Sequence, residues 1–532
     1  MLNRYANVRV LARNFNMIFA AIAMSAISLP NFASSLQVYR VPQGGVTDGI
    51  DLLGMSDMYY TDRLQGRGGC AILGEVTHSP VSLESPFLLM GAQGNATSFA
   101  PSTTLDSIPI RIVEGGAWKY VKENGDLAVY QSGSGYGQLD IEKGSFQAYA
   151  LRLSGNDAAR SHLYVTNGSS LTLTTTLFVG TDQKNGTFVL DNGNFIAYTA
   201  VEMGQFRGGE TVSTCTSVNT AIVANATLNL NTPGSDGGFH MGKNSASDGV
   251  DTTTDRNVLI LENGGVLYAK KVSRYNDSRG RIIFRGGKYT YFTRGDSNSS
   301  CAFTGGGNGT LELEGDAHPI HIDTGANTVD FCWEWTPNIV LTGNGGFKKS
   351  GEGKLVFNKP YFSSRLRSSF SGGVFVDGGI LTVSGRDNMF PATNMLFVAE
   401  GASFDMNGVH SGFSGVTGSG SVVNTSAASS TLTLGYGNGT YQFSTALGNN
   451  ISLVKTDVST LVVSGDAAGN TCDLDIKEGM VVFSSDSSSY GTVTVRSGAT
   501  LDISKCNFSC VELVREQGST IKRKPGLSIV VK

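Results

Sequence analysis

The chain has little charge, little proline and almost no tryptophan. Asp, Glu, Lys and Arg make up only 16% of its 532 residues, and it holds 12 prolines and 3 tryptophans. Strong helix formers such as Glu and Lys are therefore scarce, which argues against a helical protein. The net charge of −4 is small for this length, so the chain has no general attraction to nucleic acid or to anionic membranes.

Long hydrophobic runs are also missing beyond the N-terminus. Residues 17–29 are uncharged and mostly apolar, but this run is too short to span a bilayer. Three arginines precede it, and Pro30 and a group of small residues that includes Ala33 follow it. This order is that of a secretory signal peptide, so we predict one at residues 1–33, with a core helix as the alternative. Export predicts a secreted or cell-surface protein without a transmembrane segment in the mature chain.

Cysteine is sparse, with 7 residues spread over the whole chain. An odd number at such wide spacing does not make a disulfide scaffold. Export permits two pairs, Cys301 with Cys332 and Cys506 with Cys510. The alternative is that these side chains are small buried hydrophobes.

Glycine is abundant, with 69 residues, and 40% of the chain is hydrophobic. This balance predicts many short strands separated by turns. Three segments share one pattern of strand, glycine turn and strand: "LDIEKGSFQAYALRLSG", "LYVTNGSSLTLTTTLFVG" and "FVLDNGNFIAYTAVEMG". Their turn glycines, Gly144, Gly168 and Gly193, recur at a nearly constant interval. The sequence therefore contains an internal repeat.

Apolar residues alternate within each repeat, which gives every strand one buried and one solvated face. A unit of about 24 residues cannot bury its apolar face alone, but stacked units can. We therefore predict an all-β fold, a right-handed parallel β-helix. About 20 coils at the usual strand spacing would make a rod on the order of 100 Å long. A β-propeller is the competing architecture, but its repeats of about 40 residues are longer.

The stretch "SGEGKL" at residues 350–355 suggests a phosphate-binding loop at first sight. It lacks the earlier glycine and the following Ser or Thr that a P-loop requires. It is instead a turn, with Lys354 predicted to face solvent. It opens a longer pattern, "FKKSGEGKLVFN" followed by "SFSGGVFVDGGILTVSG". A degenerate copy, "LVKTDVSTLVVSGD", has Asp457 and Ser459 where the first copy has turn glycines.

This pattern resembles the autotransporter-associated β-strand repeat of bacterial surface proteins. The landmark positions of that repeat are occupied by Ser350, Gly351, Gly353, Leu355, Ser371, Gly372, Gly373, Gly379, Leu381 and Val383. Autotransporters end in a translocator β-barrel, whereas this chain ends in "STIKRKPGLSIVVK". The resemblance therefore implies a passenger-type surface protein without its translocator.

These observations predict five regions in the chain. The signal peptide is followed by an N-terminal cap or irregular β region at 34–110 and β-helix repeats at 111–337. Autotransporter-type repeats follow at 338–505, and residues 506–532 form a C-terminal cap. Eight glycines are predicted to be structural turn residues: Gly144, Gly168, Gly193, Gly351, Gly353, Gly372, Gly373 and Gly379.

Two stretches contain residue types that bind metals. "HPIHIDTG" places His321 and Asp323 on one face of a strand, and a histidine with a carboxylate can contribute to a metal site. Its spacing matches no zinc signature, so an exposed strand face is the alternative. "SDGVDTTTDR" at 247–256 holds three aspartates, which form either a solvated loop or a calcium site. No cofactor is predicted.

The best candidate for ligand contact is "DFCWEWTP" at 330–337, because Trp333 and Trp335 share a strand face with Phe331. If the tryptophans face outward, they make a platform on which a sugar could stack. If they face inward, they form an aromatic ladder inside the β-helix. Burial of an unpartnered Glu334 is costly, so Glu334 should point outward, which favours the inward ladder for the tryptophans.

Taken together, these features predict an exported, non-enzymatic β-helical protein, adhesin-like or structural, with glycans or cell-surface proteins as partners. The alternative is a polysaccharide lyase or glycoside hydrolase of the β-helix type. Such an enzyme needs carboxylates or cations stacked on consecutive coils, and a single sequence does not show which residues stack.

Overall fold

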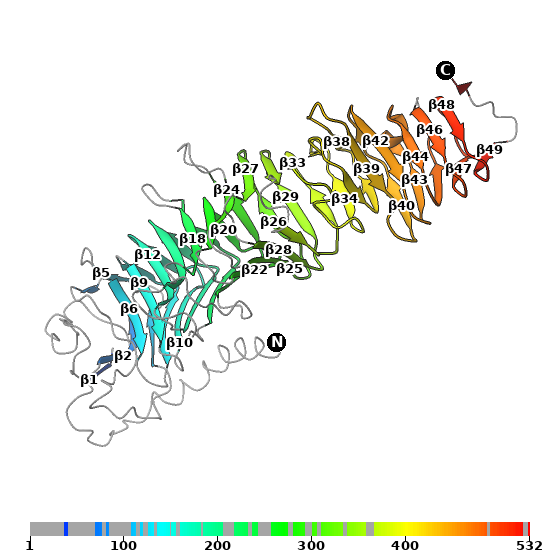
Figure 1. Cartoon of the computed structure of the whole chain (residues 1–532). Coiled ribbons are helices and arrows are strands. Elements are labelled where there is room, and N and C mark those ends of the chain that lie inside the picture. The colour runs from blue at the N-terminus through cyan, green and yellow to red at the C-terminus, as the bar shows by residue number, and fades with distance from the viewer. Residues whose placement is uncertain are drawn as a thin grey trace.

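The protein is one elongated stack of parallel strands, seen in a computed structural model of the chain (Figure 1). The stack begins with β1 and β2 at one end and finishes with β48 and β49 at the other. The structure describes residues 37–40, 70–76, 81–83, 108–112, 117–120, 126–131, 136–148, 150–155, 160–181, 185–205, 218–231, 237–242, 257–274, 280–292, 301–305, 310–332, 338–357, 366–486, 490–524 and 530–531. The predicted signal peptide lies outside these residues.

The strands form four parallel sheets, here called sheets I to IV, and each coil of the chain contributes one strand to two or three of them. The predicted parallel β-helix is confirmed. Sheet II has 18 strands, which at a spacing of about 4.8 Å amounts to about 80 Å of rod. None of the described residues forms a helix with the length and hydropathy of a membrane span.

Sheet I has 12 strands and covers the N-terminal part of the rod. Its strands in order are β1 (Gln37–Arg40), β2 (Cys70–Val76), β4 (Ile108–Ile112), β7 (Tyr136–Glu142), β10 (Arg160–Thr166), β13 (Asn185–Asp191), β16 (Asn219–Ala224), β19 (Asn257–Glu262), β22 (Gly280–Arg285), β25 (Thr310–Gly315), β28 (Asn338–Gly343) and β31 (Leu366–Ser368).

Sheet II runs the whole length of the rod. Its strands in order of pairing are β3 (Val81–Leu83), β5 (Ala117–Tyr120), β8 (Ser145–Ala148), β11 (Ser170–Leu173), β14 (Asn194–Ala197), β17 (Thr227–Asn229), β20 (Val266–Ala269), β23 (Lys288–Tyr291), β26 (Ile320–Asp323), β29 (Phe347–Ser350), β32 (Val374–Val376), β34 (Met395–Val398), β37 (Gly415–Thr417), β40 (Thr440–Phe443), β43 (Thr460–Val463), β45 (Met480–Phe483), β47 (Thr500–Ile503) and β49 (Thr520–Arg523).

Sheet III has 13 strands and stops before the C-terminal coils. They are β6 (Asp126–Gln131), β9 (Ala150–Gly155), β12 (Thr176–Thr181), β15 (Ala200–Gln205), β18 (Gly238–Met241), β21 (Lys271–Arg274), β24 (Cys301–Gly305), β27 (Thr328–Cys332), β30 (Lys354–Phe357), β33 (Ile380–Val383), β35 (Ser403–Asp405), β38 (Ser421–Val423) and β41 (Ala446–Leu447). In the next coil a short 3-10 helix, η3 (Gly465–Gly469), takes the position of a sheet III strand.

Sheet IV has 7 strands and follows sheet I along the rod. They are β36 (Ser411–Phe413), β39 (Ser430–Leu434), β42 (Ile451–Lys455), β44 (Leu474–Ile476), β46 (Tyr490–Val495), β48 (Ser509–Arg515) and β50 (Val530–Val531). Because sheet I ends at β31 and sheet IV begins at β36, only sheets II and III continue through the coil of β34 and β35.

Coil length differs between the two ends of the rod. Along sheet I the steps between residues in register are unequal, the longest running from Ala221 to Leu259 and the shortest from Leu259 to Ile282. Near the C-terminus all steps in sheet II are equal, and the residues in register there are Thr440, Thr460, Met480, Thr500 and Thr520. The predicted coil length is thus found near the N-terminal end, and coils are longer or shorter elsewhere.

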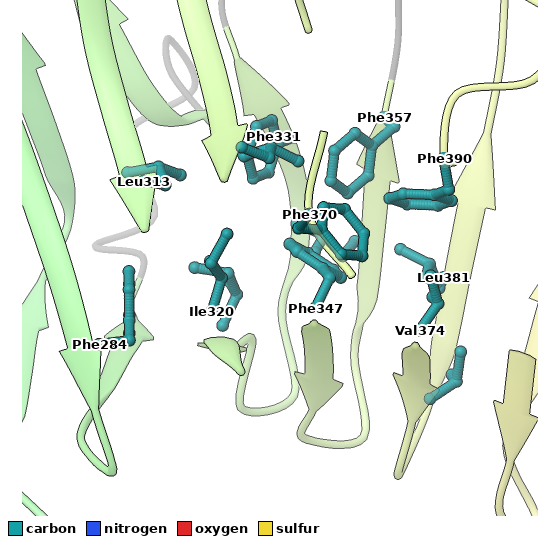
Figure 2. Packing of buried hydrophobic residues seen from close by; sticks show 14 of the residues in the cluster. Phe284, Leu313, Ile320, Phe331, Phe347, Phe357, Phe370, Val374, Leu381 and Phe390 are labelled. Carbon is teal, nitrogen blue, oxygen red and sulfur yellow. The ribbon is translucent and has the colours of Figure 1, made fainter. Parts of the chain in front are cut away.

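The inward face of the strands is almost entirely apolar. In the middle of the rod the core is aromatic, and Figure 2 shows Phe331, Phe347, Phe357, Phe370 and Phe390 packed together. The rings of Phe331 and Phe357 are stacked, with centroids 4.1 Å apart, and the ring of Phe347 meets that of Phe357 edge-on. Each of the five side chains is at most 4% exposed. Burial of this apolar surface is the main force that holds the coils together.

The predicted turn glycines all lie between strands. Gly351 has φ +83°, a conformation that favours glycine, and a Cβ there would come within 2.5 Å of the backbone nitrogen of Gly325. At Gly353 a Cβ would lie 1.9 Å from the carbonyl oxygen of Asn327 in the preceding coil. Glycine is therefore needed at both positions for one coil to approach the next.

A buried lysine fixes the turn that Gly351 and Gly353 form. Lys349 points inward and is fully buried, and its Nζ donates hydrogen bonds to the carbonyl oxygens of Gly351 (2.6 Å), Gly353 (2.6 Å) and Gly378 (2.7 Å). Burial lowers the pKa of Lys349 to about 8, while the negative charge of Asp323 opposes this effect. The side chain is therefore still protonated at pH 7 and holds the turn together by three charge-assisted bonds.

The second copy of this turn also contains a buried lysine that is hydrogen-bonded to backbone carbonyls. Lys455 is fully buried, and its Nζ bonds the carbonyl oxygens of Thr456, Asp457 (2.7 Å) and Glu478 (3.1 Å). Asp457 takes φ 60° in place of glycine, and the hydroxyl of Ser459 donates to the carbonyl of Gly435. Burial lowers the pKa of Lys455 to about 8 as well.

Lys354 is predicted to face solvent, and its side chain does so only in part. Its side chain is 33% exposed, but its Nζ lies 3.7 Å from Oδ2 of the fully buried Asp405. Asp405 also accepts hydrogen bonds from Thr382, Asn407 and Thr425, which satisfy its buried carboxylate.

Four described cysteines, Cys301, Cys472, Cys506 and Cys510, form no disulfide. Cys506 and Cys510, one predicted pair, are both buried, and so is Cys301 of the other predicted pair. Neither predicted pair is therefore formed. The alternative, that these residues serve as small buried hydrophobes, describes them better.

Candidate functional site

The outer face of sheet II carries the densest group of predicted site residues that the structure describes. His321 and Asp323 lie on β26 and share the outward face, as the strand alternation predicts, because Ile320 and Ile322 beside them are fully buried. In register with His321 stand two lysines, Lys288 in the coil before and Lys348 in the coil after. The site is thus a row of basic side chains across three coils.

The carboxylate of Asp323 is hydrogen-bonded by neighbouring groups of the protein itself. Its carboxylate accepts hydrogen bonds from Lys288 Nζ at 2.6 Å and from the backbone N–H of Gly325 at 2.9 Å. Burial alone would raise the pKa of Asp323, but these two bonds outweigh it and hold the pKa below its usual value. The carboxylate is therefore ionised and committed to the Lys288 ion pair.

His321 is neutral at physiological pH. Burial, followed by the charges of Lys348 and Lys288, lowers its pKa to about 4. Its Nε2 lies 2.8 Å from the hydroxyl of Ser350 in the next coil. A neutral imidazole beside a hydroxyl can exchange a hydrogen bond with it, but a pKa near 4 makes it a weak proton acceptor at pH 7.

The predicted pair does not assemble a metal site with a third ligand. The nearest partners of His321 and Asp323 are Ser350 and the two lysines, and cations disfavour a metal ion. Across the described ranges, no three or more His, Cys, Asp or Glu side chains gather in a way that would hold a metal. The aspartates of 247–256 lie outside those ranges.

The row continues into two aromatic side chains that the sequence alone did not single out. Lys348, which forms an ion pair with Asp377, is in register with Phe375, and Phe375 is in register with Phe397. Both rings point outward, because their strand neighbours are core valines and leucine. The rings are stacked, with centroids 4.8 Å apart and planes 6° apart. Phe397 is 36% exposed, so this pair presents apolar surface to solvent.

The tryptophans predicted to contact ligands, Trp333 and Trp335, lie outside the described residues. Phe331, which shares their strand pattern, is fully buried in the core and packs on Phe303 and Phe357. Phe331 therefore points inward and belongs to a ladder of core aromatic rings, as predicted. For the two tryptophans it stays a prediction.

Sequence reasoning missed Phe375 and Phe397 because their proximity depends on register. Phe375 and Phe397 come from successive coils, and Lys348 comes from the coil before that of Phe375. The alternation in "GGVFVDGG" and "MLFVAEG" does place each phenylalanine on the outward face of its strand, with buried residues on the other face. Aligning those two segments by their buried valines would have brought the rings together.

Comparison with known proteins identifies no relative: no family model, no curated protein and no solved structure matches this chain.

Proposed function

We propose that this chain is an exported, non-enzymatic β-helical surface or secreted protein, adhesin-like or structural, that presents one long face to glycans or cell-surface proteins. The observation that carries the proposal is sheet II, whose 18 strands continue from β3 to β49. A continuous face of this length suits an extended partner rather than a small molecule in a cleft. The autotransporter-type repeats support export to a cell surface.

The charges on this face are balanced among themselves. Lys288 is paired with Asp323 and Lys348 with Asp377, so the face presents both donors and acceptors without a strong field of one sign. Such a surface favours partners rich in neutral polar groups over nucleic acids or polyanions.

A glycan-array screen of the purified chain tests the proposal, with product analysis of every glycan that it retains. Binding without cleavage supports a non-enzymatic surface role. Cleaved product would overturn it. If no glycan is retained, adherence of protein-coated beads to intact cells tests the protein-partner form, with beads coated by an unrelated β-helix as control.

One observation favours a second candidate, β-elimination on a uronate polymer. In such a reaction cations hold the uronate carboxylate while a base removes the C5 proton. A C4–C5 double bond forms as the C4–O bond breaks, and the departing sugar oxygen takes up a proton. The Lys288, His321 and Lys348 row offers cations and a base. The ion pairs of both lysines and the low pKa of His321 oppose it. The test is ultraviolet absorbance of unsaturated product from polygalacturonate or alginate. We expect none, and absorbance that His321→Gln abolishes would establish the lyase.

A further inference from the structure

The stack of Phe375 and Phe397 has an open end. Because the ring planes are nearly parallel and the centroid separation of 4.8 Å matches the spacing of neighbouring strands, the rings are stacked along the rod axis. One face of each ring is covered by the other ring. The second face of Phe375 points toward the coil of Lys348, and that of Phe397 points toward the coil of Thr417.

Phe397 is 36% exposed, and Thr417 does not cover its second face. It is the in-register neighbour of Phe397 in the next coil, and its short side chain cannot span an aromatic ring. Ser444, whose backbone N–H bonds the carbonyl of Val416, brings another short hydroxyl side chain into the coil after that. Where a third ring would continue the stack, the chain has two hydroxyls instead.

Glycine allows the rings to lie close to the sheet. A Cβ at Gly373 would come within 3.2 Å of Phe397 and 3.4 Å of Phe375. Two residues before Thr417 on the same strand stands Gly415, which faces the carbonyl oxygen of the exposed Gln442 and the thioether end of Met395. The slot beside Phe397 is therefore bordered by the aromatic ring, by the thioether of Met395 and by short or amide side chains.

We infer that this slot binds one pyranose unit of a neutral glycan, stacked by its apolar C–H face on Phe397 and hydrogen-bonded by its hydroxyls to Thr417, Ser444 and Gln442. An aromatic face with a few polar groups around it is the usual composition of a small-ligand site. The two-ring apolar patch is too small for a protein or lipid surface. With Lys348 neutralised by Asp377, nothing in the row selects an anionic sugar.

This inference rests on the proposed surface role and specifies one subsite of it. Among the residues whose exposure the structure describes, Tyr198 and Phe397 are the two large aromatic side chains that are at least 36% exposed. Tyr198, at 39%, lies between sheets II and III many coils away and provides a matched control.

The test uses the full mature chain and a panel of immobilised neutral gluco-, galacto- and manno-oligosaccharides. Phe397→Ala removes the stacking face, and Thr417→Phe fills the slot with a third ring while keeping the existing stack. We expect each variant to weaken retention of the bound oligosaccharide by about tenfold or more, the loss of roughly 1.4 kcal/mol. Tyr198→Ala is expected to bind within about twofold of the wild type. Unchanged thermal unfolding verifies that each variant is folded.

The outcomes separate the slot from the surface role. Equal binding by wild type and Thr417→Phe overturns the slot, and the proposed function then survives through a glycan site elsewhere. Failure of the wild type to retain any neutral oligosaccharide also overturns the slot, and the bead-adherence assay then decides the proposed function by itself. A loss in Tyr198→Ala as large as in Phe397→Ala would likewise contradict it.

Discussion

The two lysine turns, 349–353 and 455–459, solve one structural problem with different residues. In the first, glycines make the close approach, and in the second a positive-φ aspartate and a serine replace them. The inward lysine and its three carbonyl bonds are common to both. The comparison shows that the buried ammonium defines this turn and that glycine is one of two ways to accommodate it.

The regions around the two turns also differ in how their coils are closed. The first turn lies among coils with strands in three sheets, whose lengths vary and whose core is aromatic. The second lies where sheet III has ended, in coils of constant length. The step between coils thus varies where three sheets support each coil, whereas after β40 the step along sheet II is constant.

Replacing the central core phenylalanine should have the largest effect and should separate the two regions. Phe347 contacts four other rings, whereas Phe483 contacts only Tyr490 and Phe508 among the described aromatic residues. We expect Phe347→Ala to lower local stability by about 3–5 kcal/mol, because it leaves a cavity in a packed cluster, and Phe483→Ala to cost less. Opening free energies from amide hydrogen exchange of the flanking strands measure both. Equal losses would contradict the proposed difference in packing.

Removing the buried ammonium should affect both turns alike. Lys349→Met and Lys455→Met each leave carbonyl oxygens buried without their donor, so we expect a loss of about 2–4 kcal/mol in either turn. Lys348→Met is the matched control, because Lys348 is half-buried on the outer face, and it should change stability by no more than about 0.5 kcal/mol. Hydrogen exchange at β29, β30 and β43 reports the effect. A loss confined to Lys349→Met would show that the second turn does not depend on its lysine.

Exchanging the turn residues should separate the two copies. Gly351→Ala introduces a Cβ at φ +83° against the backbone of Gly325, so a loss of about 1–3 kcal/mol is expected. Asp457→Gly relieves a non-glycine residue at φ 60° and should be close to neutral. Thermal unfolding of both variants checks this. If Asp457→Gly were as damaging as Gly351→Ala, the aspartate side chain would have a role beyond its backbone conformation.

A pH dependence between pH 4 and 6.5 is expected from His321 in the first region. His321 has a pKa of about 4 in the folded chain and about 6.5 when unfolded, so the folded state disfavours its protonation. Its contribution to stability is complete above pH 6.5 and is lost as the pH falls toward 4. His321→Gln should therefore flatten the fall in unfolding temperature over this interval, whereas His318→Gln, at an exposed position, should not. Identical pH profiles for wild type and His321→Gln would contradict the assignment.

The fold was accessible from the sequence because alternation and glycine spacing are local. The first two repeats can be aligned on their turn glycines, which pairs Leu139 with Leu163, and the structure places these two residues in register. The inward orientation of Lys349 was not accessible, because a charged side chain at a buried position contradicts the alternation rule unless its partners are known. Those partners include Gly378, which comes from the next coil.

The candidate surface was less accessible for the same reason. His321 and Asp323 were correctly placed on one face, since a single residue separates them on one strand. Lys288, Lys348, Phe375 and Phe397 meet that face only through register, and register depends on loops whose lengths vary from coil to coil. Periodicity gives the direction of a side chain, but not its neighbour one coil away.

The number of sheets that join successive coils also determines how the rod carries load. Its backbone hydrogen bonds lie along the axis, so under tension the coils act as links in series, and the link with the fewest bonded strands yields first. Coils from β7 to β33 are joined through three sheets, whereas the coil of β34 and β35 and the coils after β41 are joined through two. Stretching would therefore first open the coil of β34 and β35 and the coils after β41, which lead to the C-terminal end in Figure 1, while the three-sheet coils up to β33 stayed wound. Tethered at that end, the chain would be an extensible stalk with a stiff tip.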